Sequence, residues 1–427
     1  MKAVVLAAGE GTRLRPLTLT RSKHMIPLAG KPILEHLLLA LKEGGINEVL
    51  MVVNYYEDLI RNYFVDGSRW GLRINYFHQE RLLGTANAID LVEDHVDNEG
   101  FLVIYGDLLI DSSVIKSVIK KYNEKGLITL SIVPVKNPQQ YGVVTLENDL
   151  VKEIFEKPKP ESMHGNLVNA GVYVFSREIF EEIKKTSKSL RAEYEITDTL
   201  QLLLKRNVQI ASNAISPESW MDIGQPWDLL EANQRILEHA KHVNRGEVED
   251  GVHTIGVLVL EEDARIRSGA YIEGPVYIGR GSDIGPNCYV RPFTSMDRNV
   301  RIGNSCEIKN SLILNGTHIG HLSYVGDSII GENCNLGAGT LTANLRLDKK
   351  TVKVKVKDKL IDSGRRKLGV IMGDNVETGI GAKFMPGVKI EPNVWIGPGV
   401  ILNRDVPSRT FVLQKQDLEY REVKKYQ

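Results

Sequence analysis

Two different rhythms of apolar residues divide this chain of 427 residues. Over about the first 230 residues, short apolar runs alternate with segments of helical periodicity. The runs Lys2–Ala7, Glu48–Val53 and Phe101–Tyr105 predict strands, and the segments Ile33–Lys42 and Thr85–Val92 predict helices. Strands that alternate with helices favour a mostly parallel sheet covered on both faces, whose ligands bind beyond the carboxyl ends of the strands. The loops that follow Leu6 and Tyr105 are therefore expected at a binding site.

A second rhythm begins near residue 258, where aliphatic residues recur every six positions. The series contains Leu260, Ile266, Ile272, Ile278, Ile284, Val290, Met296, Ile302, Ile308 and Leu314, then Ile313, Ile319 and Val325 after a change of phase, and finally Phe384, Ile390, Ile396 and Leu402. A helix repeats at about 3.6 residues and a strand at about 2. A period of six predicts a parallel β-helix in which one aliphatic side chain of each repeat points inward.

Other patterns divide the chain further. Residues 226–250 are expected to link the domains, with one helix over Pro226–His242, between an α/β domain at 1–225 and a β-helix at 251–410. Residues 411–427 form a charged tail without an assigned role. Within the β-helix the repeat stops between Leu341 and Leu368, where Val352–Lys357 alternates valine with lysine. That alternation predicts a protruding loop or hairpin with one cationic face, and lysines that merely protect a solvated edge are an equal explanation.

Composition narrows the class of protein. The chain has 54 Lys and Arg against 54 Asp and Glu, which gives no electrostatic argument for a nucleic-acid or membrane partner. Its cysteines, Cys288, Cys306 and Cys334, form no Cys-x-x-Cys pair, so buried free thiols are expected rather than disulfides or a zinc site. The N-terminus lacks the apolar core of a signal peptide, and no apolar run is long enough to span a bilayer. We therefore expect a cytoplasmic protein.

A glycine-rich turn follows the first predicted strand, in Leu6–Leu14. Glycines let backbone N–H groups approach phosphate oxygens, and Arg13 and Lys23 add positive charge for a triphosphate. The turn is neither a Walker A loop nor a dinucleotide fingerprint. Taken alone, it is equally well explained as an ordinary turn between a strand and a helix.

Further motifs in order along the chain resemble those of the sugar-1-phosphate nucleotidylyltransferases. After Leu6–Leu14 and Lys23 they are Gln79, Gly84-Thr85, Tyr105-Gly106-Asp107, Tyr141-Gly142-Val143, Glu156-Lys157-Pro158, Asn169-Ala170-Gly171 and Trp220-Met221-Asp222-Ile223-Gly224. The resemblance implies a Rossmann-like domain in which a sugar 1-phosphate attacks the α-phosphorus of a nucleoside triphosphate and pyrophosphate leaves. Because that nucleophile is already an anion, positioning and charge neutralisation do the catalysis.

The resemblance also implies residue roles. Asp107 and Asp222 would hold Mg²⁺, a hard cation that bridges phosphate oxygens, while Arg13 and Lys23 would contact the nucleotide phosphates as catalytic residues. The nucleotide, UTP or dTTP, would be bound by Leu6, Ala7, Ala8, Gly9, Gly11, Thr12, Gln79, Gly84 and Thr85. The sugar phosphate would be bound by Tyr105, Gly142, Glu156, Lys157 and Asn169.

A second set of motifs lies on the predicted β-helix, in Gly320–Asp327, Asn335–Thr340 and Asn344. It resembles the acetyltransferase domain of the bifunctional GlmU enzymes, and the whole chain is most similar to their archaeal members. The implied architecture is a left-handed β-helix that forms a homotrimer. The implied chemistry is acetylation of glucosamine 1-phosphate with acetyl-CoA, followed by uridylyl transfer from UTP to N-acetylglucosamine 1-phosphate, which gives UDP-N-acetylglucosamine and pyrophosphate.

In this second site the resemblance makes His321 the general base. An amine must lose a proton to attack a thioester, and a group that titrates near neutrality can take it. Tyr324, Asn335 and Asn344 would orient the sugar, and Arg291, Lys309 and Lys350 would bind its phosphate. Ala338 would leave room for the acyl chain and pantetheine arm of acetyl-CoA.

Two positions depart from the bacterial pattern, and two other functions stay open. Asp222 stands where bacterial members have Asn, which leaves the preferred nucleotide and sugar undecided, and Ile380 replaces a serine that contacts coenzyme A.

One alternative function is that of a monofunctional thymidylyl- or uridylyltransferase whose β-helix only trimerises or regulates it. The other is a non-catalytic assembly subunit, which should have lost Arg13, Lys23 or an acidic metal ligand, although all of them are present.

Overall fold

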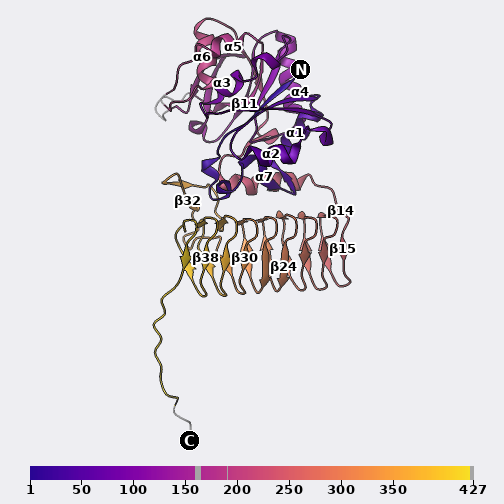
Figure 1. The fold of residues 1–427 in the computed structure, drawn as a ribbon, viewed down its shortest axis with the longest axis vertical. Helices are drawn as coiled ribbons and strands as arrows, with labels where there is room; N and C mark the ends of the chain where they lie inside the picture. Colours follow the sequence, from indigo (N-terminus) through magenta and orange to yellow (C-terminus); the bar gives the residue numbers. More distant parts are fainter. Residues whose placement is uncertain (159–164, 190, 424–427) are drawn as a thin grey trace. The chain divides into compact units, whose positions relative to one another are not determined.

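A computed structural model describes residues 1–158, 165–189 and 191–423 (Figure 1). The chain divides into two compact units, one formed by Met1–Leu14 with Arg21–Ala232 and the other by Arg15–Thr20 with Asn233–Gln427. None of the helices in the described part of the chain is long and apolar enough to cross a membrane.

The first unit is built on a mixed sheet. Its strands follow in the order β5 (Arg73–His78), β4 (Glu48–Val53), β1 (Ala3–Ala7), β6 (Phe101–Tyr105), β11 (Leu167–Phe175), β8 (Thr129–Pro134), β12 (Ala211–Ala214), β10 (Leu150–Glu156) and β9 (Gly142–Glu147). Pairing is parallel from β5 through β6 and between β8 and β12. It is antiparallel where β11 and β10 join their neighbours. The predicted strands over 48–53 and 101–105 are confirmed at both ends.

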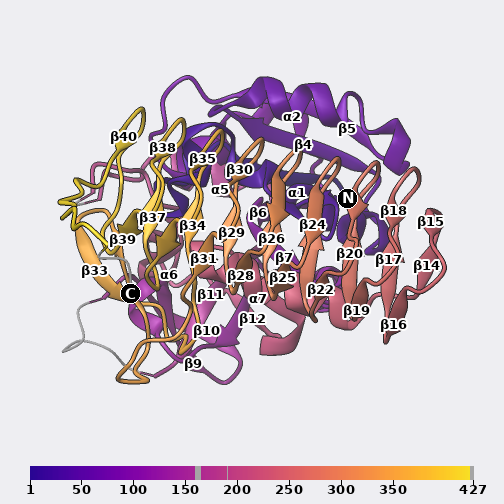
Figure 2. The same cartoon turned by 90° about the horizontal axis from the view of Figure 1, so that it is seen from below.

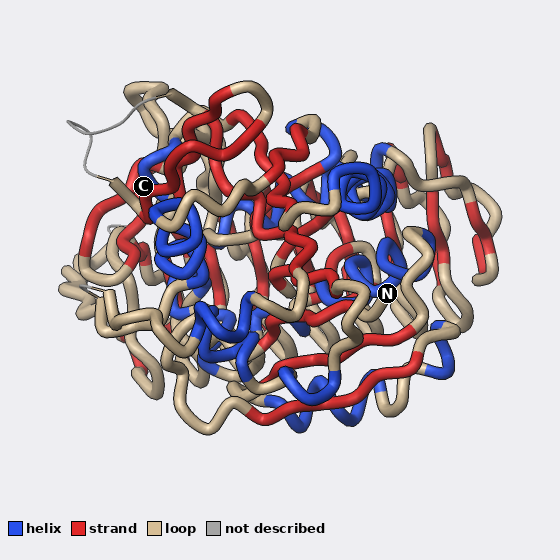
Figure 3. Tube along the Cα trace, turned by 90° about the horizontal axis from the view of Figure 1, so that it is seen from above, coloured by secondary structure: helices blue, strands red, loops and turns tan. Residues whose placement is uncertain are grey.

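Helices cover both faces of this sheet, as Figure 3 shows in blue around the red strands. On one face α1 (Ile33–Glu43) and α4 (Ser112–Lys125) pack their leucines, valines and isoleucines onto a buried cluster with β1, β4 and β6. On the other face a second cluster joins α3 (Thr85–Asp90), α5 (Ile179–Ile183) and α6 (Ile196–Lys205). The helix α2 (Glu57–Phe64) follows β4 and buries Ile60 and Phe64. Alternating β-branched strands and amphipathic helices thus produce the α/β layers that the periodicity predicts.

The second unit is a parallel β-helix, and residues 243–412 supply its three sheets. The first sheet contains β14 (Val243–Asn244), β17 (Leu258–Leu260), β20 (Val276–Ile278), β23 (Thr294–Met296), β26 (Leu312–Ile313), β29 (Ile329–Ile330), β34 (Ile371–Met372) and β37 (Lys389–Ile390). The second contains β15 (Glu247–Val248), β18 (Arg265–Ile266), β21 (Asp283–Ile284), β24 (Arg301–Asn304), β27 (His318–His321), β30 (Asn335–Leu336), β35 (Glu377–Thr378), β38 (Trp395–Ile396) and β40 (Phe411–Val412). The third contains β16 (His253–Ile255), β19 (Tyr271–Glu273), β22 (Tyr289–Val290), β25 (Glu307–Lys309), β28 (Tyr324–Gly326), β31 (Leu341–Thr342), β36 (Lys383–Phe384) and β39 (Ile401–Leu402).

Each coil of this helix places one strand in each sheet, so the coils follow one another along the stack (Figure 2). The aliphatic side chains of the six-residue series fill the interior in one continuous buried cluster. A Rossmann-like unit followed by a left-handed parallel β-helix is the fold class that the sequence predicts, and it is confirmed.

One position of the predicted series is wrong. Early coils advance by 18 residues, as the pairing of Ile266 with Ile284 shows, but Met296 pairs with Ile313 after only 17. Because one turn is shorter by a residue, Ile313 points into the core where Leu314 was expected. Leu314 is buried but does not belong to the interior cluster.

The interruption between Leu341 and Leu368 contains the predicted hairpin. Its strands β32 (Lys353–Val356) and β33 (Lys359–Asp362) pair antiparallel, and Lys353 faces Asp362. Val354 and Val356 are buried, while the lysines that alternate with them are exposed. The period-two pattern therefore predicted both the hairpin and its cationic face.

Several element ends differ from the expected ones. The helix expected over 226–242 is α7 (Pro226–Glu238), and α3 ends at Asp90 instead of Val92. The strands β14 and β15 place residues 243–248 in the first coil, ahead of the expected start at 251. At the far end β40 pairs with β38, so residues 411–412 continue the β-helix.

Two candidate active sites

In the first unit, a cleft of ≈ 190 Å³ lies beyond the ends of several strands. Its lining includes eight of the residues that the sequence proposed, and they come from β6, β9, β10, β11, β13 (Trp220–Asp222) and the glycine-rich turn: Arg13, Tyr105, Asp107, Gly142, Glu156, Lys157, Asn169 and Asp222. The metal and sugar candidates therefore share one cavity with Arg13.

A small antiparallel sheet brings the two aspartates together. The strand β7 (Leu108–Ile110) begins directly after Asp107 and pairs with β13, which sets Asp222 opposite Leu108. The backbone N–H of Ile223 donates to the carbonyl of Asp107 at 3.1 Å. Two positions far apart in the sequence thus present their carboxylates to the same cleft.

The two carboxylates have different electrostatic surroundings. Burial alone would raise the pKa of Asp107, but its ion pair with the Lys23 ammonium and the nearby charge of Arg13 hold that pKa below its ordinary value. Burial and the charge of Asp107 raise the pKa of Asp222 to about 6. The hydroxyl of Tyr141 is hydrogen-bonded to Asp222, and burial first and the charge of Asp222 second raise the pKa of Tyr141.

This pair of carboxylates suits a magnesium ion. A divalent cation would relieve both the desolvation of Asp222 and its repulsion by Asp107. Within the described residues no group of three or more His, Cys, Asp or Glu side chains could hold a metal. Mg²⁺ needs no such group, since it is usually bound by one or two carboxylates together with substrate phosphates and water.

Glu156 and Asn169 form the other end of the cleft, around Gly142. A Cβ atom on Gly142 would lie 3.1 Å from Oε2 of Glu156 and 3.5 Å from Cβ of Asn169, so the bare glycine leaves the space between them free. Glu156 accepts hydrogen bonds from Arg191 at 3.1 Å and Thr197 at 3.3 Å. These two bonds hold the carboxylate of Glu156 in place at this end of the cleft.

The nucleotide candidates lie outside the lining of this cleft. Leu6, Ala7, Ala8, Gly9, Gly11 and Thr12 form the end of β1 and the turn after it. A Cβ on Gly9 would lie 3.9 Å from Nζ of Lys23, so Lys23 connects this turn with Asp107. The buried amide of Gln79 donates to the carbonyl of Gly84 at 3.2 Å and to Asn87 at 3.0 Å.

Gly84 and Thr85 begin α3, and their conformations fit those positions. Gly84 has φ of +110°, and a Cβ there would approach the carbonyl oxygen of Tyr194 to 2.5 Å, so only glycine is accommodated. The hydroxyl of Thr85 accepts a hydrogen bond from the N–H of Ile196 at 2.9 Å. Gln79, Gly84 and Thr85 therefore form one local unit.

The sequence reasoning missed two aromatic residues of the cleft. Tyr141 and Trp220 belong to motifs that were noticed, but no role was given to them. The indole N–H of Trp220 donates to the carbonyl of Ala170 at 2.8 Å, and its ring lies edge-on to that of Tyr141. Large aromatic residues inside otherwise polar motifs were the signal that could have predicted a role in lining the cleft.

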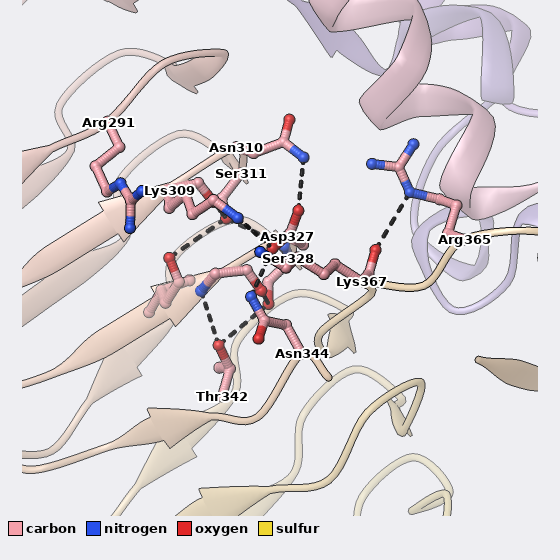
Figure 4. A network of polar contacts seen from close by, with 12 residues as sticks. Arg291, Lys309, Asn310, Ser311, Asp327, Ser328, Thr342, Asn344, Arg365 and Lys367 are labelled. Atoms are coloured by element: carbon pink, nitrogen blue, oxygen red, sulfur yellow. Dashed lines mark hydrogen bonds and ion pairs between the residues drawn. The ribbon is translucent and has the colours of Figure 1, made fainter. Parts of the chain in front are cut away.

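In the second unit, Lys309, Tyr324 and Asn344 meet near a corner between the third and first sheets. Figure 4 shows Lys309 and Asn344 beside Asp327. The amide of Asn344 donates to the hydroxyl of Tyr324 at 3.0 Å and to the carboxylate of Asp327 at 2.6 Å. Lys309 donates to the same carboxylate at 3.2 Å. Arg291 stands one coil earlier and forms an ion pair with Glu307 at 2.9 Å. Asp327 was not singled out from the sequence.

His321 lies at a different corner, at the exposed end of β27. Its carbonyl accepts hydrogen bonds from the N–H of Gly339 at 3.2 Å and the hydroxyl of Ser323 at 2.8 Å. Leu322, with φ of +51°, then turns the chain into β28, which carries Tyr324. The backbone is thus fixed while the imidazole stays open to solvent.

A shallow groove of ≈ 450 Å³ is lined by Leu322, the residue that follows His321, and by residues of the later coils. Most of the residues that line it are small or apolar: Leu322, Ala338, Gly339, Ile380, Gly381, Pro398, Gly399 and Gln416. Ala338, the predicted acetyl-CoA contact, lies on this groove, and so does Ile380.

Two of the predicted acceptor residues lie elsewhere. Asn335 is exposed on the second sheet and pairs with His318. Lys350 is exposed in the insertion, where its N–H donates to Asp348 at 3.2 Å. Within one chain, Lys309, Tyr324 and Asn344 therefore lie together. Asn335 and Lys350 lie apart from that group.

Comparison with known proteins covers both units. A family model described as nucleotidyl transferase matches residues 2–239, and one described as the GMPPB C-terminal domain matches 272–379. A protein of Methanocaldococcus jannaschii named bifunctional protein GlmU is 43% identical over 99% of this chain and 100% of its own length. A bifunctional sugar-1-phosphate nucleotidylyltransferase/acetyltransferase of Sulfurisphaera tokodaii is 43% identical over 95% of this chain and 98% of its own. The structure of a UDP-glucose pyrophosphorylase complexed with UDP-glucose covers 56% of this chain and 99% of its own, with 26% identity and a TM-score of 0.51.

Proposed function

The chain belongs to the family of bifunctional GlmU proteins, and from that premise we propose that it makes UDP-N-acetylglucosamine in two steps. Its β-helix acetylates glucosamine 1-phosphate with acetyl-CoA. Its α/β unit then joins the product, N-acetylglucosamine 1-phosphate, to the uridylyl group of UTP. The observation that carries this proposal is that the chain matches bifunctional relatives over its full length. The cleft that Asp107 and Asp222 line and the polar network around Asn344 support it.

In the α/β unit, an oxygen of the sugar phosphate forms a bond with the α-phosphorus of UTP. The bond from that phosphorus to the bridging oxygen breaks, and pyrophosphate leaves. Arg13 and Lys23 neutralise the charge that develops on the phosphate oxygens. Gly142, Glu156 and Asn169 bind the sugar hydroxyls, and Lys157 binds its phosphate.

Asp107 and Asp222 hold Mg²⁺ in this proposal. The ion supplies charge neutralisation and a template for the phosphate oxygens. Support comes from the enclosed carboxylate pair and from the pKa of Asp222, which burial and the charge of Asp107 raise to about 6. Lys23, already paired with Asp107, is placed to exchange that partner for a phosphate.

In the β-helix, the amino group of glucosamine 1-phosphate attacks the thioester carbonyl of acetyl-CoA. A carbon–nitrogen bond forms, the carbon–sulfur bond breaks, and the imidazole of His321 takes the proton that the nitrogen loses. Tyr324 and Asn344 orient the sugar, and Arg291 and Lys309 bind its phosphate. The pantetheine arm lies in the groove that passes Ala338.

We assign the solution assembly as a homotrimer. The acetyl site of one chain has an open groove, and Asn335 and Lys350 lie apart from Tyr324 and Asn344. Neighbouring subunits would supply the missing walls and residues. We also assign the protein to the cytoplasm in this proposal.

The test uses purified full-length protein in two assays. Pyrophosphate release is measured with UTP or dTTP, Mg²⁺ and a panel of sugar 1-phosphates. Thiol release is measured with acetyl-CoA and glucosamine 1-phosphate or galactosamine 1-phosphate. Pyrophosphate release without thiol release would favour the monofunctional nucleotidylyltransferase, and absence of both would favour an assembly subunit.

A further inference from the structure

A buried carboxylate, Asp327, lies at the centre of the polar network beside the acetyl-acceptor residues (Figure 4). Its Oδ1 accepts a hydrogen bond from Asn310 at 2.7 Å, and its Oδ2 accepts from Asn344 at 2.6 Å and Lys309 at 3.2 Å. Only 3% of the residue is exposed. A buried charge is tolerated only where it is paired and hydrogen-bonded, and these three donors meet that need.

An ionised carboxylate can only accept hydrogen bonds, and this fixes the orientation of Asn344. The side-chain amide of Asn344 must turn its NH₂ group toward Asp327. Its other N–H donates to the hydroxyl oxygen of Tyr324 at 3.0 Å. Both amide hydrogens are then used inside the protein, and Oδ1 of Asn344 remains as an acceptor for a ligand.

The direction of the hydrogen bonds that Asp327 imposes on Asn344 also determines that of Tyr324. Because its hydroxyl oxygen accepts from Asn344, its own proton is available to donate outward. Lys309 is held through one of its three ammonium donors, and two remain for a phosphate. One carboxylate therefore decides which atoms of three neighbouring side chains face a substrate.

We propose that Asp327 is a positioning residue that sets the hydrogen-bond polarity of the acetyl-acceptor site through Asn344, Tyr324 and Lys309. The inference rests on the proposed acetylation of an amino-sugar phosphate. It adds a residue that touches no substrate itself and determines that Asn344 accepts while Tyr324 and Lys309 donate.

The backbone of Asp327 has a separate structural role. Its N–H donates to the carbonyl of Lys309 at 2.9 Å, and its carbonyl accepts from Gly369 at 2.8 Å. These bonds join consecutive coils and do not involve the carboxylate. Replacing the side chain by one of equal size therefore leaves the coil register in place and changes only the polarity of the network.

The first variant is Asp327→Asn, which has the same shape but lacks the charge. Its amide can donate as well as accept, so Asn344 and Tyr324 lose their fixed orientation. We expect the KM for glucosamine 1-phosphate to rise about ten- to a hundredfold, in line with the loss of hydrogen bonds to a charged group. The KM for acetyl-CoA and the rate of pyrophosphate release should stay within about twofold, which is the usual scatter of distant substitutions.

A second variant separates polarity from structure. Asp327→Asn combined with Asn344→Asp restores an amide–carboxylate pair with its direction reversed. Tyr324 must then donate to residue 344, so its proton no longer faces the ligand, and the site gains a negative charge beside the sugar phosphate. We expect the melting temperature to return toward the wild-type value while acetyl transfer stays low. Recovery of acetyl transfer together with stability would show a merely structural role and overturn the proposal.

The matched control is Asp374→Asn, which removes another buried carboxylate of the β-helix, whose Oδ1 accepts from the N–H of Glu332 at 2.8 Å. It should leave the KM for glucosamine 1-phosphate unchanged.

Calorimetric titration of each folded protein with glucosamine 1-phosphate gives an independent measurement of binding. In it, Asp327→Asn should weaken binding by about the same factor as KM rises. If wild-type protein releases no thiol, the proposed function itself fails. If it does and Asp327→Asn binds the sugar phosphate normally, only the present inference is wrong.

Discussion

The two candidate sites of this chain handle charge in opposite surroundings. In the α/β unit, Asp107 and Asp222 share an enclosed cleft of ≈ 190 Å³ with Arg13, and Lys23 pairs with Asp107. On the β-helix, His321 is exposed, and the residue that follows it, Leu322, lines a shallow groove. The first site concentrates its charged groups in one cleft, and the second spreads its groups along a surface.

This difference follows from the two architectures. At the edge of an α/β sheet, loops from several strands converge and enclose a ligand. In a solenoid each repeat contacts only its neighbours, so side chains stand in rows and form few walls. A reaction between two anions benefits from the enclosed site, whereas acylation of an amine needs a base, an orienting network and a channel for a long thioester. The sites should therefore fail independently and in different ways.

The largest expected effect tests that independence at the exposed site. His321→Ala should lower acetyl transfer by about 10²–10⁴-fold, the usual contribution of a general base, because no other group takes the proton from the amine. Pyrophosphate release should be unchanged, since the α/β unit does not use this side chain. Both rates are measured on the same preparation.

A control for that experiment lies on the same strand. His318→Ala removes an exposed imidazole three positions earlier in β27, and both activities should persist. Equal losses in the two variants would show that strand β27, and not the base, was damaged. Loss of pyrophosphate release in His321→Ala would break the division of labour between the units.

The next effect tests the enclosed site. Asp107→Asn should lower pyrophosphate release by about 10²–10³-fold, because it removes a charge that faces both Lys23 and the proposed cation. Thiol release should continue at the wild-type rate. Asp58→Asn, at an exposed position of α2, is the matched control and should leave both rates intact.

The sequence predicted the fold well because both architectures have local signals. Alternating runs such as Phe101–Tyr105 and the six-residue series depend on neighbours along the chain, and β6 and the β-helix core match them. The misplaced Leu314 shows the limit of that reasoning. A coil one residue shorter changes which side chain faces inward. The change of phase is visible in the sequence, but the pairing of Met296 with Ile313 is needed to choose Ile313 over Leu314.

The candidate sites could be predicted mainly by resemblance. Nothing local in the sequence brings Asp222 beside Asp107, because their approach depends on the long-range pairing of β7 with β13. Asp327 was quoted within a motif but received no role, since a lone aspartate in a turn is usually solvated. Its importance lies in three donors from other coils, which become visible only when the coils are stacked.

A smaller effect is expected when pH changes the Mg²⁺ requirement of pyrophosphate release at the first site. Burial and the charge of Asp107 raise the pKa of Asp222 to about 6, because both disfavour its ionised form. Protons and Mg²⁺ should therefore compete for it. As the pH falls below about 6, the Mg²⁺ concentration that gives half-maximal pyrophosphate release should rise about tenfold per pH unit. A requirement for Mg²⁺ that is flat from pH 7 to pH 5 would exclude Asp222 as a ligand.

The smallest effects should come from the open groove, where a ligand is only partly enclosed. Ala338→Leu adds bulk beside the proposed path of pantetheine and should raise the KM for acetyl-CoA about tenfold. Ile380→Ser removes apolar area from the same groove and should raise it by about fivefold or less. Neither change should alter the KM for glucosamine 1-phosphate, because Lys309 and Asn344 lie at another corner. If Ile380→Ser lowered the KM for acetyl-CoA instead, the serine found in bacterial relatives would be the better contact, and the apolar groove would not be the channel for the thioester.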